Sequence, residues 1–67
     1  MNSIFQKQIV KIEYTNWKGV NSIRNIIPQA IYFGSTQYHF NCWLLKAWDI
    51  DKDDTRDFKL IDIKFLE

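Results

Sequence analysis

Two residues of types that can perform nucleophilic chemistry stand close together in the middle of the chain, Cys42 and His39. A thiolate beside an imidazole can attack a substrate, but the pair also needs a third group to orient the base. No acidic residue is evident for that role, and positions three apart on a strand point to opposite faces. We therefore expect Cys42 to be a small buried apolar side chain, and the protein not to be an enzyme. His39 stays a candidate phosphate contact, because histidine is the side chain whose charge ordinarily changes near neutral pH.

An acidic cluster, Asp49, Asp51, Asp53 and Asp54, is the second candidate for chemistry. Carboxylates at this spacing can bind calcium, but the usual calcium loop also has a central glycine and a downstream bidentate glutamate. Both are missing here. We expect a solvated turn, with neither a metal nor another cofactor.

The composition of the 67-residue chain is that of one small domain with an aromatic-rich core. Hydrophobic residues make up 46% and aromatic residues 16%, which compensates for the small size. Nine basic and eight acidic residues give a formal net charge of +1, which argues against a bulk electrostatic grip on nucleic acid but allows a local basic pocket. A single cysteine, with no signal peptide and no spanning stretch, predicts a cytoplasmic protein that enters no membrane.

Alternating apolar and polar residues predict a chain of short β-strands. Val10, Ile12 and Tyr14 share one side of the first, and the Asn and Gly of residues 15–19 predict a hairpin loop. Trp17, near the loop tip, either folds back over the domain or docks a partner. The expected strands are residues 8–14, 21–27, 29–33, 38–49 and 56–60, with Pro28 breaking or bending the chain, turns at 34–37 and 51–55, and a loose arm or helical lead-in at 1–7.

The apolar pattern changes phase near the end of the chain, where Leu60 and Ile61 are adjacent. A bulge or one tight helical turn within residues 60–63 would absorb this shift. Five short strands predict an all-β fold, a small and strongly bent antiparallel barrel. Trp43 and Trp48 cannot both point inward on one regular strand, so one of them should lie on the outer face.

The chain resembles the WYL domain from about Ile12 to Phe65. The matching positions, in order, are Tyr14, Arg24, Ile27, Pro28, Trp43, Leu45, Ala47, Arg56, Phe58, Leu60 and Ile63. Residues 14–19 and 33–36 are also similar to free-standing small WYL-like proteins of bacteria and phages. The resemblance implies a five-stranded Sm-like barrel and a single domain over residues 1–67, without room for the DNA-binding winged helix-turn-helix that most WYL domains follow.

The resemblance also implies a ligand-binding groove lined by aromatic and basic residues, here Tyr14, Arg24, Trp43 and Arg56. Trp17, His39 and Lys46 are candidates for additional contacts. Two guanidinium groups can hold phosphate oxygens in two-point geometry, and an aromatic face can stack a base. Alternatives remain: Arg24 pairs with Asp49, Asp57 or Asp62, Arg56 pairs with an acidic residue of 51–57, and Trp43 belongs to the core.

Two departures from the family pattern weaken the nucleotide assignment. Leu44 replaces the central tyrosine of the motif, and Asp62 stands where a basic residue usually precedes the closing isoleucine. The leading hypothesis is a non-catalytic, phage-associated regulator or sequestering protein that binds a nucleotide-like ligand or a nucleic-acid segment. A protein-interaction module, which binds a second copy or a host protein through exposed aromatic residues, is the alternative, and binding of single-stranded nucleic acid is a third hypothesis.

Overall fold

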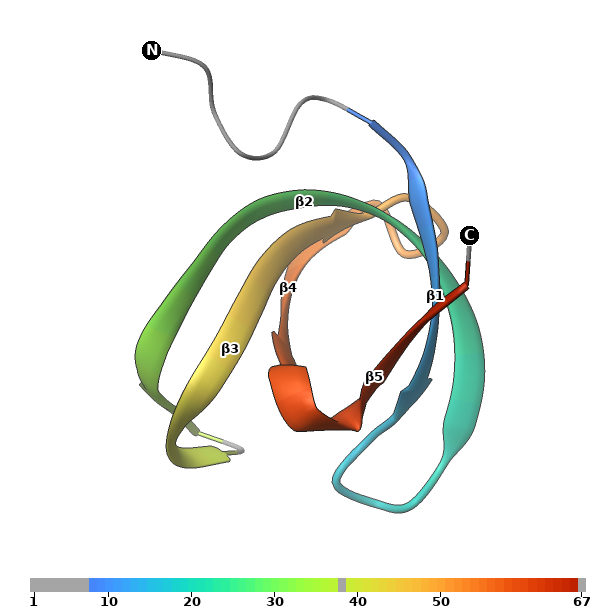
Figure 1. Ribbon diagram of the computed structural model, residues 1–67. Helices are drawn as coiled ribbons and strands as arrows, with labels where there is room; N and C mark the ends of the chain where they lie inside the picture. The colour runs from blue at the N-terminus through green and yellow to red at the C-terminus, as the bar shows by residue number, and fades with distance from the viewer. Residues whose placement is uncertain (1–7, 38, 67) are drawn as a thin grey trace, which may run out of the picture.

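The computed structural model describes residues 8–37 and 39–66, so the predictions for residues 1–7 and Tyr38 lie outside the described part. A single antiparallel sheet of five strands, in the order β4-β3-β2-β1-β5, makes up the domain (Figure 1). The all-β prediction is confirmed. The strands are β1 (Val10–Thr15), β2 (Asn21–Thr36), β3 (His39–Asp49), β4 (Asp54–Lys59) and β5 (Ile63–Leu66).

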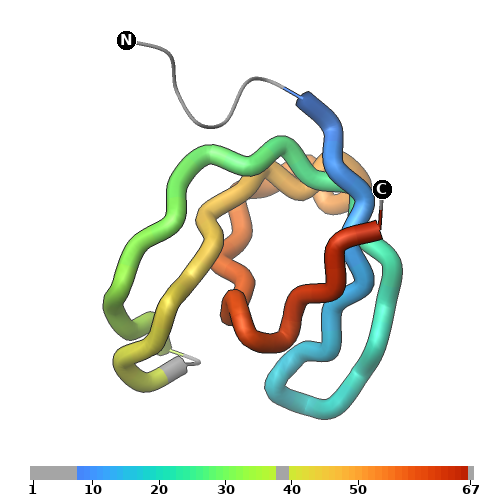
Figure 2. Tube along the Cα trace, in the orientation of Figure 1, coloured from blue at the N-terminus to red at the C-terminus, as the bar shows by residue number. Residues whose placement is uncertain are grey.

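Strand β2 is a single element of 16 residues, where the sequence predicted two strands. Its pairing with β3 shifts register between Pro28 and Ala30, which is a bulge or irregularity next to the proline. A bulge bends a strand without ending it, because the pairing resumes on the other side. β2 can therefore pair with β1 through residues 21–26 and with β3 from Ile26 to Thr36. Figure 2 shows the resulting curvature along this segment.

The sheet curls strongly but is not closed. Its edge strands β4 and β5 pair with β3 and β1 respectively, and the described parts of the two edges are not paired with each other. The 3-10 helix η1 (Leu60–Asp62) connects them and confirms the predicted tight turn. A closed Sm-like barrel is not confirmed. Of the apolar residues beyond the phase shift, Ile63 packs on the core, whereas Ile61 and Phe65 are exposed.

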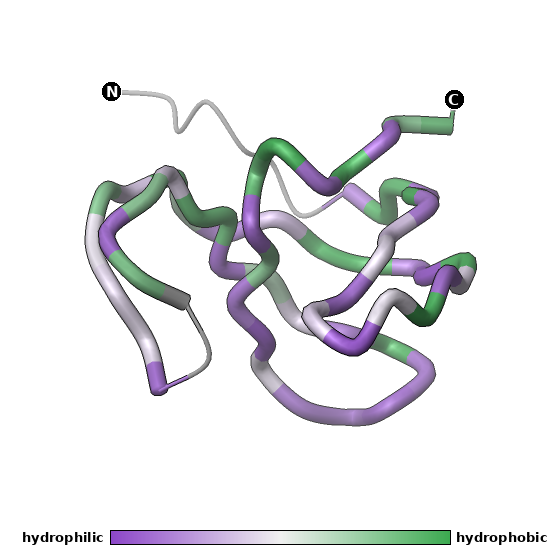
Figure 3. The backbone as a smooth tube through the Cα atoms, turned by 90° about the horizontal axis from the view of Figure 1, so that it is seen from below, coloured by the Kyte–Doolittle hydropathy of each residue, from purple (hydrophilic) through white to green (hydrophobic). Residues whose placement is uncertain are grey.

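Hydrophobic and hydrophilic residues alternate along much of the sheet (Figure 3), and a subset of the hydrophobic ones forms the core. Its buried members are Ile12, Tyr14, Ile26, Leu45, Ala47 and Phe58. Tyr14 and Phe58 meet edge to face, with ring centroids 4.8 Å apart. Aromatic pairs prefer this geometry, so β1 and β4 are joined here although they are not neighbours in the sheet.

No helix in the described part of the chain has the length and apolar character needed to cross a membrane.

Candidate functional site

An open cleft of about 300 Å³ brings together three of the four predicted ligand-binding residues, Tyr14, Arg24 and Arg56. The full lining is Tyr14, Asn16, Trp17, Lys18, Arg24, Arg56, Asp57 and Phe58. These residues come from β1, the loop that follows it, β2 and β4. The curl of the sheet is what brings β4 to the same cleft as β1 and β2.

The loop between β1 and β2 presents Trp17 and Lys18 at this cleft. The Asn16 side-chain oxygen accepts hydrogen bonds from the backbone N–H groups of Lys18, at 2.9 Å, and Val20, at 3.0 Å. Gly19 closes the turn with a φ of 79°, a backbone angle that glycine adopts without a steric cost. Trp17 is 61% exposed, and the Lys18 ammonium lies 5.2 Å from its ring centroid. The loop thus gives the cleft an indole and a cation.

Arg24 is held from two sides. Its Nε donates to Ser22 Oγ at 2.9 Å, and its Nη1 donates to Asp49 Oδ2 at 2.7 Å. The side chain of Arg24 is 18% exposed, while that of Asp49 is 0% exposed. Of the three alternative partners of Arg24, Asp49, Asp57 and Asp62, it is Asp49 that forms the ion pair. Arg24 nevertheless lines the cleft. Its guanidinium has further N–H groups beyond the two that make the bonds described here.

Arg56 differs from Arg24 in its surroundings. It stands exposed on the edge strand β4, opposite Ala47 of β3. Within the described residues it makes no ion pair, so the alternative that it pairs with an acidic residue of 51–57 is wrong. Arg56 also lines a second, polar cleft, whose lining residues are Thr36, Gln37, Asp54, Thr55, Arg56 and Asp57. Arg56 is thus an exposed cation that lines both clefts.

Tyr14 forms part of the wall of the cleft and offers little exposed ring surface for stacking. It is only 5% exposed and in an edge-to-face contact with Phe58, and its hydroxyl accepts a hydrogen bond from the backbone N–H of Lys59 at 3.1 Å. Burial raises the pKa of Tyr14, with a smaller opposing effect of the Lys59 hydrogen bond, so the side chain is neutral at ordinary pH. The broadly exposed ring in the cleft is that of Trp17.

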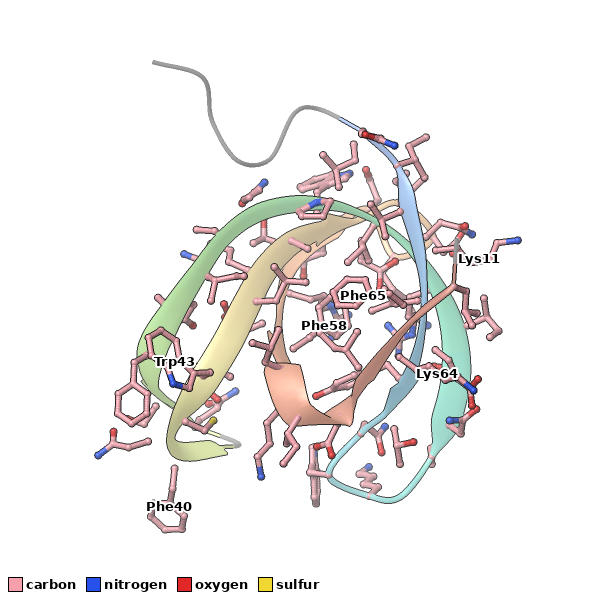
Figure 4. The ribbon with its side chains drawn as sticks, viewed as in Figure 1. Lys11, Phe40, Trp43, Phe58, Lys64 and Phe65 are labelled. Carbon is pink, nitrogen blue, oxygen red and sulfur yellow. The ribbon has the colours of Figure 1, made fainter. Side chains whose placement is uncertain are left out.

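Trp43 lies outside the cleft, so the structure does not place it with the other three residues. It is also not part of the core: its side chain is 56% exposed and packs edge to face on Phe33, with centroids 5.4 Å apart. Figure 4 shows it on the side of the sheet away from Phe58. Trp43 lines a separate, mainly apolar cleft with Cys42, Lys59 and Ile61. Cys42 is half-buried there, less enclosed than the sequence predicted.

Of the three candidates for additional contacts, Trp17 lines the cleft and Lys46 does not. The Lys46 ammonium lies 6.0 Å from the ring centroid of Tyr32, whose hydroxyl donates to Asp57 Oδ1 at 2.8 Å. The side chain of His39 lies outside the described part of the structure. Sequence reasoning missed Lys18 as a lining residue, although its place beside Trp17 in an Asn-to-Gly loop was a usable signal.

The contact between Tyr32 and Asp57 predicts a pH dependence. Desolvation and the hydrogen bond to the carboxylate raise the pKa of Tyr32 to about 12. Because this folded-state value exceeds the usual value of about 10, the stabilisation is complete below about pH 10 and is lost towards pH 12. We expect Tyr32→Phe to reduce the loss of stability over this window in urea unfolding. An unchanged alkaline profile would contradict the prediction, and Tyr14→Phe reports the share of the second tyrosine.

The acidic cluster divides into two parts. Asp51 and Asp53 are exposed in the β3–β4 turn, as predicted, and Asp54 is exposed but already belongs to β4, which begins two residues earlier than expected. Asp49, in contrast, is completely buried beside Arg24. Among residues 8–37 and 39–66, no three His, Cys, Asp or Glu side chains gather in a way that could hold a metal ion.

These features define a small, curled all-β domain with a basic and aromatic cleft. A family model, the WYL domain, matches residues 1–67, which is the whole chain. The chain therefore belongs to the WYL domain family, whose domains are in general ligand-binding or regulatory. No curated protein and no solved structure matches it significantly.

Proposed function

We propose that the cleft binds a phosphate-bearing, nucleotide-like ligand or a nucleic-acid segment, and that the protein is a non-catalytic regulator or sequestering module. The observation that carries this proposal is the convergence of Arg24, Arg56 and Lys18 beside the exposed ring of Trp17. Guanidinium groups donate to phosphate oxygens in charge-assisted hydrogen bonds, and an indole face stacks on any base. A phage protein that sequesters a host nucleotide would use such a cleft.

The charges in the cleft suggest that the two arginines have different roles in binding. Arg24 is neutralised by the buried carboxylate of Asp49 and is fixed by two hydrogen bonds. Arg56 has no described ion pair, and Lys18 is exposed at the loop tip. Arg56 and Lys18 should therefore provide the long-range electrostatic attraction for an anion. Arg24 should provide hydrogen-bond donors whose direction is fixed.

Calorimetric titration with inorganic phosphate and with mono-, di- and cyclic nucleotides tests the proposal. We expect Arg56→Ala to weaken binding of every phosphate-bearing ligand by roughly 10–100-fold, the range for a lost charge-assisted hydrogen bond, and to reduce the salt dependence. Trp17→Ala should weaken binding of nucleotides but not of inorganic phosphate, because only a base can stack. Both variants remove exposed side chains, so folding should be retained.

Lys64→Ala is the matched control, because it removes an exposed cation that does not line the cleft (Figure 4). It should bind like the parent protein. Equal affinity of Arg56→Ala and the parent would refute the assignment of the cleft, and no binding of any ligand in the panel would refute the proposed function.

A protein-interaction module is the second candidate, favoured by the exposed apolar side chains at the far end of the β2–β3 hairpin and on η1. They are Phe33, Phe40, Trp43 and Ile61, and Phe40 is 94% exposed. Exposed apolar patches of this kind often mark a binding surface for a protein. Light scattering and pull-down experiments separate the two candidates: a monomer that captures no protein argues against this one.

A further inference from the structure

We infer that Asp49 is the positioning residue of the cleft, because its buried carboxylate fixes the Arg24 guanidinium on one side and the β3–β4 turn on the other. Oδ2 accepts from Arg24 Nη1 at 2.7 Å. Oδ1 accepts from the backbone N–H groups of Asp51, at 3.1 Å, and Lys52, at 3.2 Å. The inference rests on the proposed function and adds to it a residue that is not among those lining this cleft.

The location of Asp49 in the sheet explains how one side chain reaches both partners. It is the last residue of β3, paired with Ile26 of β2 and with Asp54 of β4. An aspartate at a strand end commonly accepts hydrogen bonds from the backbone N–H groups two or three residues later, which shapes the turn. The other carboxylate oxygen remains available for Arg24, two positions before Ile26 on β2. Both oxygens thus have partners, which a fully buried carboxylate requires.

Asn25, the residue after Arg24, also holds the turn, and the hydrogen bonds described for it do not involve the Arg24 guanidinium. The carbonyl of Asn25 accepts from the backbone N–H of Ile50 at 3.0 Å, and its side-chain amide donates to Asp51 Oδ2 at 3.2 Å. The turn therefore has one anchor that it shares with the cleft, Asp49, and one that it does not, Asn25. Variants of these two residues can therefore distinguish an effect on the conformation of the turn from an effect on the orientation of the Arg24 guanidinium.

Two effects of Asp49 on anion binding have opposite signs. Its negative charge lowers the positive potential of the cleft, so electrostatics alone predicts tighter phosphate binding after Asp49→Asn. Its hydrogen bond holds Arg24 in one orientation, so positioning predicts weaker binding after the same change. The 2.7 Å contact to a completely buried carboxylate favours positioning as the larger effect. The sign of the change in affinity therefore distinguishes the two.

The experiment compares Asp49→Asn with the parent by two-dimensional NMR and by titration with inorganic phosphate. Asparagine keeps the size of the side chain and a carbonyl oxygen for the turn, but it loses the charged acceptor of Arg24. We expect the Arg24 Nε–Hε signal to shift or broaden, and phosphate affinity to fall roughly tenfold, as for one charge-assisted hydrogen bond. The amide signals of Asp51 and Lys52 should change less than in Asp49→Ala.

Asn25→Ala is the control, because it should shift the turn amides while the Arg24 signal and the phosphate affinity stay at the parent values. Ser22→Ala is a second test that leaves the buried charge in place: it removes the other anchor of Arg24 and should also weaken phosphate binding. If Asp49→Asn does not fold, the phosphate affinity of Ser22→Ala decides whether phosphate binding depends on fixing the Arg24 guanidinium.

Phosphate binding by Asp49→Asn as tight as or tighter than that of the parent, with an unchanged Arg24 signal, would overturn the inference. So would parent-like phosphate binding by Ser22→Ala where Asp49→Asn does not fold. A parent protein that binds neither phosphate nor nucleotide would count against the proposed function instead. The ligand-free Arg24 and turn signals would then still decide whether Asp49 joins these two parts of the structure.

Discussion

Arg24→Ala is expected to lower the free energy of unfolding by about 3–5 kcal/mol, the usual cost of removing one partner of a buried ion pair. The variant leaves the Asp49 carboxylate, which is 0% exposed, without its cation. A chain of 67 residues has a total stability of only about 3–10 kcal/mol. Arg24→Ala should therefore unfold at much lower urea than the parent, or be largely unfolded in buffer, as measured by circular dichroism and tryptophan fluorescence.

Arg56→Ala provides the contrast, because the same type of side chain is exposed and has no described ion pair. Its stability should stay within about 0.5 kcal/mol of the parent. The double variant Arg24→Ala, Asp49→Asn should recover part of the loss, since the buried charge is gone. Unfolding of Arg24→Ala at the same urea concentration as Arg56→Ala would contradict this view. A loss of binding in Arg24→Ala is thus poor evidence for a ligand contact.

Much of the fold follows from local patterns, and the exceptions depend on contacts between distant strands. Alternation predicts the β1 strand and its inward Ile12 and Tyr14, and the change of phase predicts the turn at η1. Pro28 bends β2 instead of ending it because β3 continues to pair with β2 beyond the proline. The sequence of β2 alone does not contain this information. Closure of the sheet likewise depends on how far β4 and β5 approach each other.

The site shows the same division between local and distant information. The family resemblance identifies Tyr14, Arg24 and Arg56, which the structure brings to one cleft. It places Trp43 among the four ligand-binding residues and Trp17 only among the additional contacts, because the strand pattern does not say where the curl leaves a side chain uncovered. Trp43 lies at such an uncovered place, while Trp17, from a polar loop, lines the cleft. The direction of a loop depends on bonds such as those of Asn16, which spacing alone does not predict.

Phe58→Ala is expected to destabilise the domain by about 3–5 kcal/mol, the range for removing a buried phenylalanine ring. Phe58 is 3% exposed and lies inside the curl of the sheet (Figure 4). It pairs with Leu45 of β3 in register and packs edge to face on Tyr14 of β1. The loss would therefore separate the edge strand β4 from β1, and urea unfolding should show a midpoint far below that of the parent.

Phe40→Ala is the matched control, because the same ring is 94% exposed at the end of the hairpin and its removal should change stability by less than about 0.5 kcal/mol. Phe58→Leu should lie between the two, since it retains most of the apolar volume. Similar midpoints for Phe58→Ala and Phe40→Ala would show that the core does not depend on this ring. Phe58 also lines the cleft, so its loss would move Arg56 and Tyr14 relative to each other. Affinity in Phe58→Leu should thus fall with inorganic phosphate as well as with nucleotides, unlike the effect of Trp17→Ala.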